Sequence, residues 1–348
     1  MAQPILTTDL KAVTENWRAL DRMSAGHVQT GAVVKANAYG LGAGKIAEAL
    51  IDAGVTQFFV ATANEGATLR QSIGPNPTIH LFCGHMAGDC TLIDAQKLTP
   101  LLNSPEQLKR HLEHLPDHPF GLQLDTGMGR LGMQSGDWES CRAKAMAANP
   151  TLVMSHLACA DEPDHPMNAQ QLTRFTQLTH SLGLPRSLSA TGGVLLGPEY
   201  HFDLTRPGIG IYGGLPFSDA RNVVSLSVPV IQIRDLSKGD SVGYANSWIA
   251  KQPTCVATVA AGYADGLPRS ISNNAVFYCK GIQCPIIGRI SMDLITIDIT
   301  HLPTTPDSLD ILCENQGIDQ LAQHSGTIGY EILTSLGARY ERRYKGAT

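Results

Sequence analysis

The sequence lacks the features of a membrane or exported protein. It contains no run of about 18 apolar residues, which is the length that a membrane-spanning helix needs. The opening stretch, MAQPILTTDL, has no basic segment followed by an apolar run, so we expect no signal peptide. These absences predict a cytoplasmic protein with no membrane partner.

Metal-site and nucleic-acid signatures are missing as well. The 8 cysteines are scattered, without a C-x-x-C pair or a histidine at zinc-ligand spacing, so we expect reduced thiols and no metal site. The formal net charge is −5, which leaves no basic surface for nucleic acid. Charged residues make up only 16% of the chain and hydrophobic ones 43%, which indicates a compact globular protein rather than a disordered one.

The first two thirds of the chain alternate short apolar runs with stretches long enough for a helix. One such helix should begin at Ser104-Pro105-Glu106-Gln107, which combines an N-cap, an N1 proline and a capping-box glutamine. Eight β-then-α units predict an α/β fold with a closed (β/α)₈ barrel of the TIM type, with an open doubly wound sheet as the alternative. The strands are expected near residues 28–35, 57–62, 78–83, 98–102, 119–125, 151–157, 186–191 and 202–206.

The pattern changes after Asn222. Val223–Arg234 is a long alternating run, and Lys280-Gly281 is typical of a hairpin turn. We therefore predict two domains: a barrel over residues 1–222, whose first residues pair with the second domain, and a mostly-β domain over 223–348. Strands of the second domain are expected at 254–260, 275–278 and 285–300, with a late helix near 330–336.

Lys35 is the first candidate for chemistry. It ends the apolar run of the segment VVKANAYGLG, which begins at Val33. A lysine that is desolvated at the end of a buried strand loses its proton more readily and can form a Schiff base. The following glycines leave backbone exposed, and Tyr39 adds a phenol, as a phosphate-bearing ligand would need. The alternative is a strand-end lysine that extends its amine into solvent.

Further candidates follow later strands of the predicted barrel, where the working residues of this fold lie. Arg130 follows the fifth strand, His156 ends the sixth, and Arg206 follows the eighth. The backbone N–H groups of Thr191–Gly193 and of Gly208 and Ile209 could hold a phosphate. Each has an ordinary alternative: a core histidine, a glycine turn, or an Arg130 that pairs with the nearby Asp125.

These segments resemble the alanine racemase family, in the same order along the chain. VVKANAYGLG matches the family's pyridoxal-phosphate segment, so Lys35 would carry the cofactor and Tyr39 would contact its phosphate. DTGMGRLG matches the family loop whose arginine binds the substrate carboxylate, which would be Arg130. SHLACAD matches the family's histidine segment, so His156 would contact the cofactor. DLTRPGIGIYG places Arg206 at the pyridine nitrogen.

The resemblance continues through the second domain. DSVGY matches the family segment that carries the second catalytic base, which would be Tyr244. GYADG matches the segment whose tyrosine lines the site entrance, which would be Tyr263. GRISMD matches the segment in which the backbone N–H of a methionine, here Met292, would face the substrate carboxylate. GTIGYE matches the segment whose tyrosine, here Tyr330, would contact the phosphate. From the residues alone Tyr244 is not distinguishable from Tyr263 or Tyr278.

The resemblance implies a pyridoxal-phosphate-dependent isomerase that interconverts L-alanine and D-alanine by two bases, Lys35 and Tyr244, and supplies D-alanine for peptidoglycan. It also implies a homodimer in which each active site takes residues from both subunits. The alternatives are a racemase for serine or for many amino acids, a decarboxylase of the same fold, and a cofactor-binding protein without catalysis.

Three positions depart from the family's pattern. Gln123 stands where many members have a lysine that becomes carbamylated, and an amide does not supply that negative charge. Ala190-Thr191 replaces the usual Asn-Ser, which keeps a hydroxyl and loses an amide. Ser291 replaces the commoner cysteine.

Overall fold

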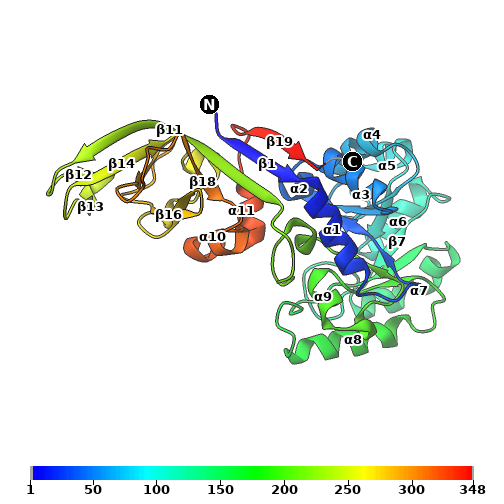
Figure 1. Cartoon of the computed structure of the whole chain (residues 1–348). Coiled ribbons are helices and arrows are strands. Elements are labelled where there is room, and N and C mark those ends of the chain that lie inside the picture. The colour runs from blue at the N-terminus through cyan, green and yellow to red at the C-terminus, as the bar shows by residue number, and fades with distance from the viewer. Residues whose placement is uncertain (1–2, 347–348) are drawn as a thin grey trace. The chain divides into compact units, whose positions relative to one another are not determined.

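A computed structural model describes residues 3–346, which form two compact units (Figure 1). One unit holds Thr14–Ile211 and Pro216–Asp219, and we call it the barrel unit. The other combines the start of the chain up to Val13 with Tyr212–Leu215 and the chain from Ala220 onward, and we call it the β-rich unit. Within residues 3–346, no helix has the length and apolar character to cross a membrane.

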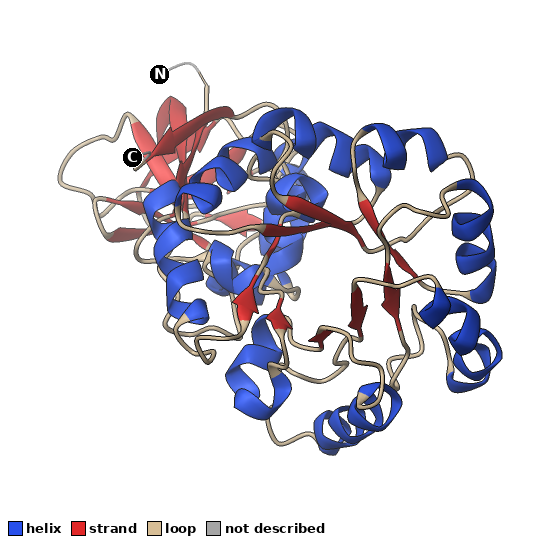
Figure 2. Cartoon of the chain, turned by 90° about the vertical axis from the view of Figure 1, so that its right-hand side faces the viewer, coloured by secondary structure: helices blue, strands red, loops and turns tan. Residues whose placement is uncertain are grey.

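The barrel unit is a closed ring of parallel strands with helices on its outside (Figure 2). The sheet runs in chain order from β3 (Ala32–Val33) to β9 (Arg186–Ser187), and β10 (Leu204–Thr205) pairs with β2 (Gln29–Thr30). The N–H of Gly31 donates to the carbonyl of Thr205 (2.9 Å), and that of Asp203 donates to the carbonyl of Arg186 (3.0 Å), so β10 bridges the two ends of the sheet. The predicted (β/α)₈ barrel is therefore confirmed, and the open-sheet alternative is wrong.

All eight predicted strands are present, although each is shorter than its apolar run. The strands are β2 (Gln29–Thr30) and β3 (Ala32–Val33), which share the first run, and β4 (Gln57–Val60), β5 (Thr78–Leu81), β6 (Thr99–Leu102), β7 (Gly121–Gln123), β8 (Leu152–Met154), β9 (Arg186–Ser187) and β10 (Leu204–Thr205).

Some of the helices of the barrel unit begin at a residue whose side chain caps them, namely at Thr62, Ser104 and His165, and others begin without a side-chain cap. The Ser104 side chain accepts a hydrogen bond from the N–H of Gln107 (3.2 Å), as the predicted cap requires. The helices are α1 (Leu10–Asp21), α2 (Lys35–Tyr39), α3 (Ala43–Asp52), α4 (Ala63–Ile73), α5 (Cys90–Ala95), α6 (Pro105–His114), α7 (Ser135–Ala147), α8 (Pro166–Thr179) and α9 (Thr191–Leu196).

An apolar core lies between the strands and the outer helices. Trp138 of α7 packs with Phe120, Leu122 and Val153 around β7 and β8, and all four side chains are buried. Burying a large apolar side chain contributes about 1.5–3 kcal/mol, so this layer fixes the strand ends on which the candidate residues stand.

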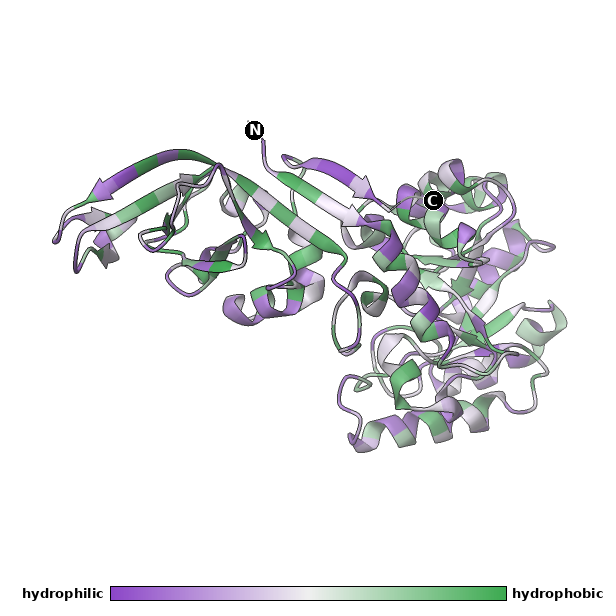
Figure 3. Ribbon diagram, viewed as in Figure 1, coloured by the Kyte–Doolittle hydropathy of each residue, from purple (hydrophilic) through white to green (hydrophobic). Residues whose placement is uncertain are grey.

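The β-rich unit is built on one long strand, β11, whose polar and apolar residues alternate along its first half (Figure 3). β11 pairs antiparallel with β1 (Ile5–Asp9), which also pairs in parallel with the C-terminal strand β19. The other elements are β11 (Val224–Leu236), β12 (Ser241–Val242), β13 (Trp248–Ile249), β14 (Thr254–Val259), β15 (Val276–Cys279), β16 (Ile282–Pro285), β17 (Ile295–Asp298), β18 (Ser308–Leu312), β19 (Glu341–Lys345), α10 (Ile318–Ser325) and α11 (Gly329–Ser335).

Two expectations for this unit have different outcomes. Lys280 and Gly281 form the tight turn between β15 and β16, with φ of 49° and 84°, and two positive φ angles are typical of a type I′ hairpin. The strand predicted over 285–300 is wrong, because a loop separates β16 from β17. That loop carries Met292 and turns back on itself through a hydrogen bond from the N–H of Ser291 to the carbonyl of Leu294 (3.1 Å).

Buried histidines make the barrel unit sensitive to acid. Burial, and then the charge of Arg206, lowers the pKa of His80 to about 3. Burial, followed by neighbouring basic groups, lowers the pKa of His85 to about 4. In the unfolded chain both titrate near 6.5, so below that pH the unfolded chain binds more protons than the folded one. The stability is therefore complete above about pH 6.5 and is lost as the pH falls toward the folded pKa.

Replacing His80 should remove part of this loss. Between pH 7 and 5 we expect His80 alone to cost about 2 kcal/mol of the free energy of unfolding. A glutamine can still donate to Gln57, the present partner of His80 at 2.7 Å, and does not titrate. Urea unfolding at both pH values should show a smaller acid loss for His80→Gln than for wild type. The exposed His180→Gln is the control, and equal losses in all three proteins would contradict the assignment.

Candidate active site

Lys35 lies two residues after the end of β3, with its ammonium 5.7 Å from the centre of the Phe82 ring. Burial, and then the charge of Arg130, lowers the pKa of this amine, while Glu65 and Cys83 act in the opposite direction. None of the ion pairs found within residues 3–346 includes Lys35. A partly desolvated lysine without a carboxylate partner is suited to act as a nucleophile or a base.

The four residues after Lys35 form a left-handed turn. Ala36, Asn37, Ala38 and Tyr39 have φ between 51° and 55°, although none of them is glycine. A left-handed conformation costs roughly 1–2 kcal/mol per residue, and runs of it are rare. The turn therefore persists only because its surroundings hold it, and strain of this kind is typical of functional sites.

The turn carries Tyr39 to the end of β10. Tyr39 is buried, and its hydroxyl lies so close to Gly208 that any side chain there would collide with it. Glycine is thus required at 208 because the phenol approaches the backbone. Tyr39 and Gly208, which the sequence predicts to share a phosphate, lie next to each other.

Thr191 joins this group through its hydroxyl. Its Oγ1 accepts hydrogen bonds from the N–H groups of Gly208 (3.0 Å) and Gly210 (3.2 Å). Thr191 also opens α9, in which the N–H of Val194 donates to the carbonyl of Ala190 (3.0 Å). The N–H groups of residues 191–193 precede that first helical bond and have no acceptor within the helix. Such a cradle of N–H groups favours an anion.

Arg206 is fully buried in the barrel interior. One terminal nitrogen donates to the hydroxyl of Ser187 and the other to the carbonyl of Ser155 (2.8 Å). Burial lowers the pKa of Arg206 to about 9, so the guanidinium stays charged at neutral pH. Its partners are dipoles rather than carboxylates, which leaves a net positive charge in the core and an electrostatic demand for an anion.

His156 is kept neutral by burial and, after that, by the neighbouring cations. Burial lowers its pKa to about 3, with Arg206, Arg130 and Lys35 as the further causes. The carbonyl of His156 accepts a hydrogen bond from the amide of Gln171 in α8 (2.9 Å), and the same amide donates to Thr126 (3.0 Å). The sequence does not single out Gln171, since a glutamine inside a helix carries no motif.

Asp125 holds the loop that carries Arg130 through hydrogen bonds to the backbone, and it does not form an ion pair with Arg130. The Asp125 carboxylate accepts hydrogen bonds from the N–H groups of Gly127, Met128 and Gly129 at 2.9–3.2 Å. The alternative in which Arg130 pairs with Asp125 is therefore wrong. Gln123, at the end of β7, is buried and its Oε1 has no hydrogen-bond partner within residues 3–346.

The remaining candidates lie in the β-rich unit. Tyr244, Tyr263 and Met292 have exposed fractions of 69%, 44% and 53%, which is unusual for such large side chains. The N–H of Tyr263 donates to the carbonyl of Ser291 (3.1 Å), so the Tyr263 and Met292 segments lie against each other. Gly243, beside Tyr244, approaches the backbone of Arg289 in the GRISMD segment. Tyr330 is half-buried in α11.

The predicted residues thus fall into two sets. The barrel unit gathers Lys35, Tyr39, Arg130, His156, Thr191, Arg206, Gly208 and Ile209 at the carboxyl ends of its strands. The β-rich unit holds Tyr244, Tyr263, Met292 and Tyr330. The first set forms a positively charged site with an N–H cradle.

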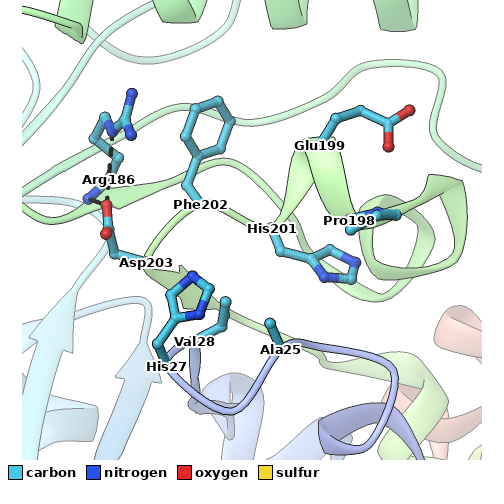
Figure 4. A pocket seen from close by; sticks show the side chains of 9 residues that line it. All are labelled: Ala25, His27, Val28, Arg186, Pro198, Glu199, His201, Phe202 and Asp203. Atoms are coloured by element: carbon cyan, nitrogen blue, oxygen red, sulfur yellow. Dashed lines mark hydrogen bonds and ion pairs between the residues drawn. The ribbon is translucent and has the colours of Figure 1, made fainter.

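A cavity of about 370 Å³ lies at the opposite end of the barrel (Figure 4). His27, Phe202 and Asp203 precede β2 and β10, so the cavity belongs to the amino ends of the strands. Asp203 forms an ion pair with Arg186 (3.6 Å). The residues that line the cavity include none of the predicted site residues. In barrels of this type the amino-terminal face usually serves stability, and the active site lies at the carboxyl-terminal face.

The fold and the site together define a (β/α)₈-barrel protein with a partly desolvated lysine and a cradle of N–H groups at the carboxyl ends of the strands. Family models described as "Alanine racemase, N-terminal domain" and "Alanine racemase, C-terminal domain" match residues 8–216 and 223–344. The chain belongs to the alanine racemase family, whose members are isomerases.

Individual alanine racemases are similar to this chain over nearly its full length. An alanine racemase of Cereibacter sphaeroides is 61% identical over 344 residues, which are 99% of each chain. One of Dinoroseobacter shibae is 58% identical, again over 99% of each chain. A crystal structure of alanine racemase from Bartonella henselae with covalently bound pyridoxal phosphate has a TM-score of 0.94 at 36% identity, covering 99% of this chain and 100% of that one.

The hydroxyl of Thr191 should be essential to the cradle. Thr191→Val keeps the shape but leaves the buried N–H groups of Gly208 and Gly210 without an acceptor, at about 1–3 kcal/mol each. Urea unfolding of the cofactor-free chain should show a loss of this order for Thr191→Val. Thr191→Ser, which retains the hydroxyl, is the matched control and should unfold close to wild type. A valine variant as stable as the serine variant would contradict the role.

Proposed function

We propose that this protein interconverts L-alanine and D-alanine with pyridoxal phosphate as cofactor, and so supplies D-alanine for peptidoglycan. The observation that carries the proposal is the amine of Lys35, which forms no ion pair within residues 3–346, together with the cradle of N–H groups at residues 191–193. A phosphate-bearing aldehyde would bind to both, because its aldehyde reacts with an amine and its phosphate accepts hydrogen bonds. Family membership supports the same reaction and cofactor. The chemistry that pyridoxal phosphate supplies when bound is an electron sink that acidifies the Cα–H of an amino acid.

The residues of the barrel unit fit this cofactor. The three N–H groups that open α9 and the phenol beside Gly208 suit a dianionic phosphate. The buried charge of Arg206 gains a partner, and the neutral imidazole of His156 can pack against a ring. Lys35 would hold the cofactor covalently, Tyr39, Thr191, Gly208, Ile209 and Tyr330 would hold the phosphate, and His156 and Arg206 would face the ring.

Arg206 also sets the strength of the electron sink. Its guanidinium remains protonated at neutral pH, so it would donate a hydrogen bond to the ring nitrogen without giving up its proton. An aspartate at this place would keep the nitrogen protonated and strengthen the sink. The weaker sink suits proton exchange at Cα and limits side reactions such as transamination.

Inversion at Cα requires a group on each face of the substrate. Lys35 would take the proton from D-alanine, and Tyr244 would take it from L-alanine, with the other group returning a proton to the opposite face. Arg130 and the N–H of Met292 would hold the substrate carboxylate. Tyr263 would narrow the entrance, which favours a small side chain.

Each site would draw on both subunits of a homodimer. Tyr244, Met292 and Ile249 of the β-rich unit are more than half exposed, and exposed apolar side chains of this size favour a covering partner. Two-fold pairing would place Tyr244, Tyr263 and Met292 of one subunit at the barrel of the other, twice. We place the functional division of the chain between residues 222 and 223, and the enzyme in the cytoplasm, where its free thiols persist.

Exchange of the Cα proton tests the activity and the substrate together. In deuterium oxide we expect label at Cα of both alanine enantiomers, and much less with serine or larger amino acids. Lys35→Ala should remove the exchange entirely, because it lacks the attachment amine. The control is Lys45→Ala, which removes an exposed lysine that pairs with Glu48. Release of CO₂ without label would instead identify a decarboxylase.

Tyr244→Phe should separate the two directions of the reaction. Loss of the phenol removes the base for L-alanine, so abstraction from L-alanine should fall by about 10²–10⁴-fold. Abstraction from D-alanine should fall much less. The primary isotope effect and the single-turnover rate in each direction measure this difference. The control is Tyr278→Phe, on β15. Equal losses in both directions would contradict the assigned faces.

A further inference from the structure

Glu65, on the first turn of α4, is bonded to two neighbouring strand ends. Its Oε1 accepts a hydrogen bond from the N–H of Ala36 (2.9 Å), and its Oε2 accepts one from the N–H of Ala61 (2.7 Å). Ala36 lies three residues after the end of β3, and Ala61 follows the last residue of β4. One carboxylate thus ties together the ends of two paired strands.

This arrangement differs from an ordinary helix cap. Thr62 is the N-cap of α4, and its side chain accepts from the N–H of Glu65 (3.3 Å). In a capping box the glutamate would return to the N-cap N–H. Here both carboxylate oxygens are used outside the helix, which indicates a role beyond starting α4.

The bond to Ala36 satisfies the first donor of the left-handed turn. Inside the turn the N–H of Ala38 donates to the carbonyl of Val34 (2.8 Å), and that of Gly40 donates to the carbonyl of Ala36 (2.7 Å). The N–H of Ala36 comes before these bonds, as the first N–H groups of any helical turn do. A charged acceptor gives a stronger hydrogen bond than a neutral one, so Glu65 is well suited to hold a strained turn.

We propose that Glu65 is a positioning residue that holds the left-handed turn after Lys35, and thereby fixes the directions of the Lys35 amine and the Tyr39 phenol. The proposal deepens the function proposed above and rests on it for the role of Lys35. Glu65 does not form an ion pair with Lys35 within 4.0 Å in the described structure, so the amine stays available for reaction.

Glu65 also acts on Lys35 through its charge. The charged and titratable groups that influence this amine are Arg130, which lowers its pKa, and Glu65 and Cys83, which raise it. His156 is neutral at physiological pH. Removing the Glu65 charge should therefore lower the pKa of Lys35 and make it a base at lower pH.

The test uses the full-length, cofactor-loaded enzyme and the variant Glu65→Gln. The glutamine amide can accept only one of the two N–H groups, and its NH₂ faces the other. We expect amide hydrogen exchange of residues 36–40 to accelerate by about 10–100-fold, as loss of a charged hydrogen bond implies. The release of cofactor should accelerate with it. The acidic limb of the pH profile of kcat should move to lower pH for D-alanine only.

Two controls separate positioning from general loss of structure. Thr62→Ala removes the cap of α4 but leaves the carboxylate, so it should leave the exchange of residues 36–40 and the pH profile unchanged. Glu48→Gln removes an exposed carboxylate on α3 and should also have no effect. Glu65→Asp keeps the charge with a shorter reach, so it should accelerate exchange while leaving the pH profile in place, and it serves if the glutamine variant does not fold.

A Glu65→Gln enzyme that matches Glu48→Gln in hydrogen exchange, cofactor release and pH profile would overturn the proposal. Equal effects of Thr62→Ala and Glu65→Gln would also overturn it, because they would assign the role to the helix cap. Neither result touches the proposed function, which the exchange of the Cα proton of alanine by the wild-type enzyme tests separately.

Discussion

The structure is organised around positive charge at the carboxyl ends of the barrel strands. Arg206 is buried and forms no ion pair with a carboxylate within residues 3–346, and the charge of Arg130 lies near enough to disfavour the charged form of Lys35. Burying unpaired charge is expensive, so a fold retains it only where a ligand compensates. An amino acid and a phosphate-bearing cofactor together bring the anions that this site requires. Burial and then the same cations lower the pKa of His156 and keep its imidazole neutral.

Backbone groups determine how that charge is presented. Asp125 holds the Arg130 loop through three N–H groups, Thr191 holds the Gly208 loop through two, and Glu65 bonds to the turn that follows Lys35. In each case a side-chain oxygen satisfies the N–H groups of an irregular loop. The loops are therefore rigid without regular secondary structure, as an active site requires.

Much of the fold was predictable because the barrel repeats one pattern. Eight apolar runs indicated eight strands, but their lengths were overestimated, since residues such as Leu188 and Ser189 are buried without belonging to β9. The Lys280-Gly281 turn was predictable from local chemistry. β19 was not, because its sequence, ERRYK, is too charged to resemble a strand and depends on pairing with β1.

The candidate site was predictable where a motif carries it and not where tertiary contacts do. The segment around Lys35 indicated a reactive amine, but four left-handed residues in succession have no signal in Ala-Asn-Ala-Tyr. Thr62 and Glu65 have capping-box spacing, which predicts the helix start and gives no sign of the bond to Ala36. Arg339 bridges Asp265 and Asp293, which lie 74 and 46 residues earlier in the sequence, and only the folded β-rich unit reveals this bridge.

The central claim is that pyridoxal phosphate is joined to the amine of Lys35. Borohydride reduction of the cofactor-supplied enzyme, followed by proteolysis and mass mapping, tests it most directly. We expect one phosphopyridoxyl group per chain, on the peptide that contains Lys35. A protein that stays colourless and whose Lys35 is unmodified after reduction would contradict it.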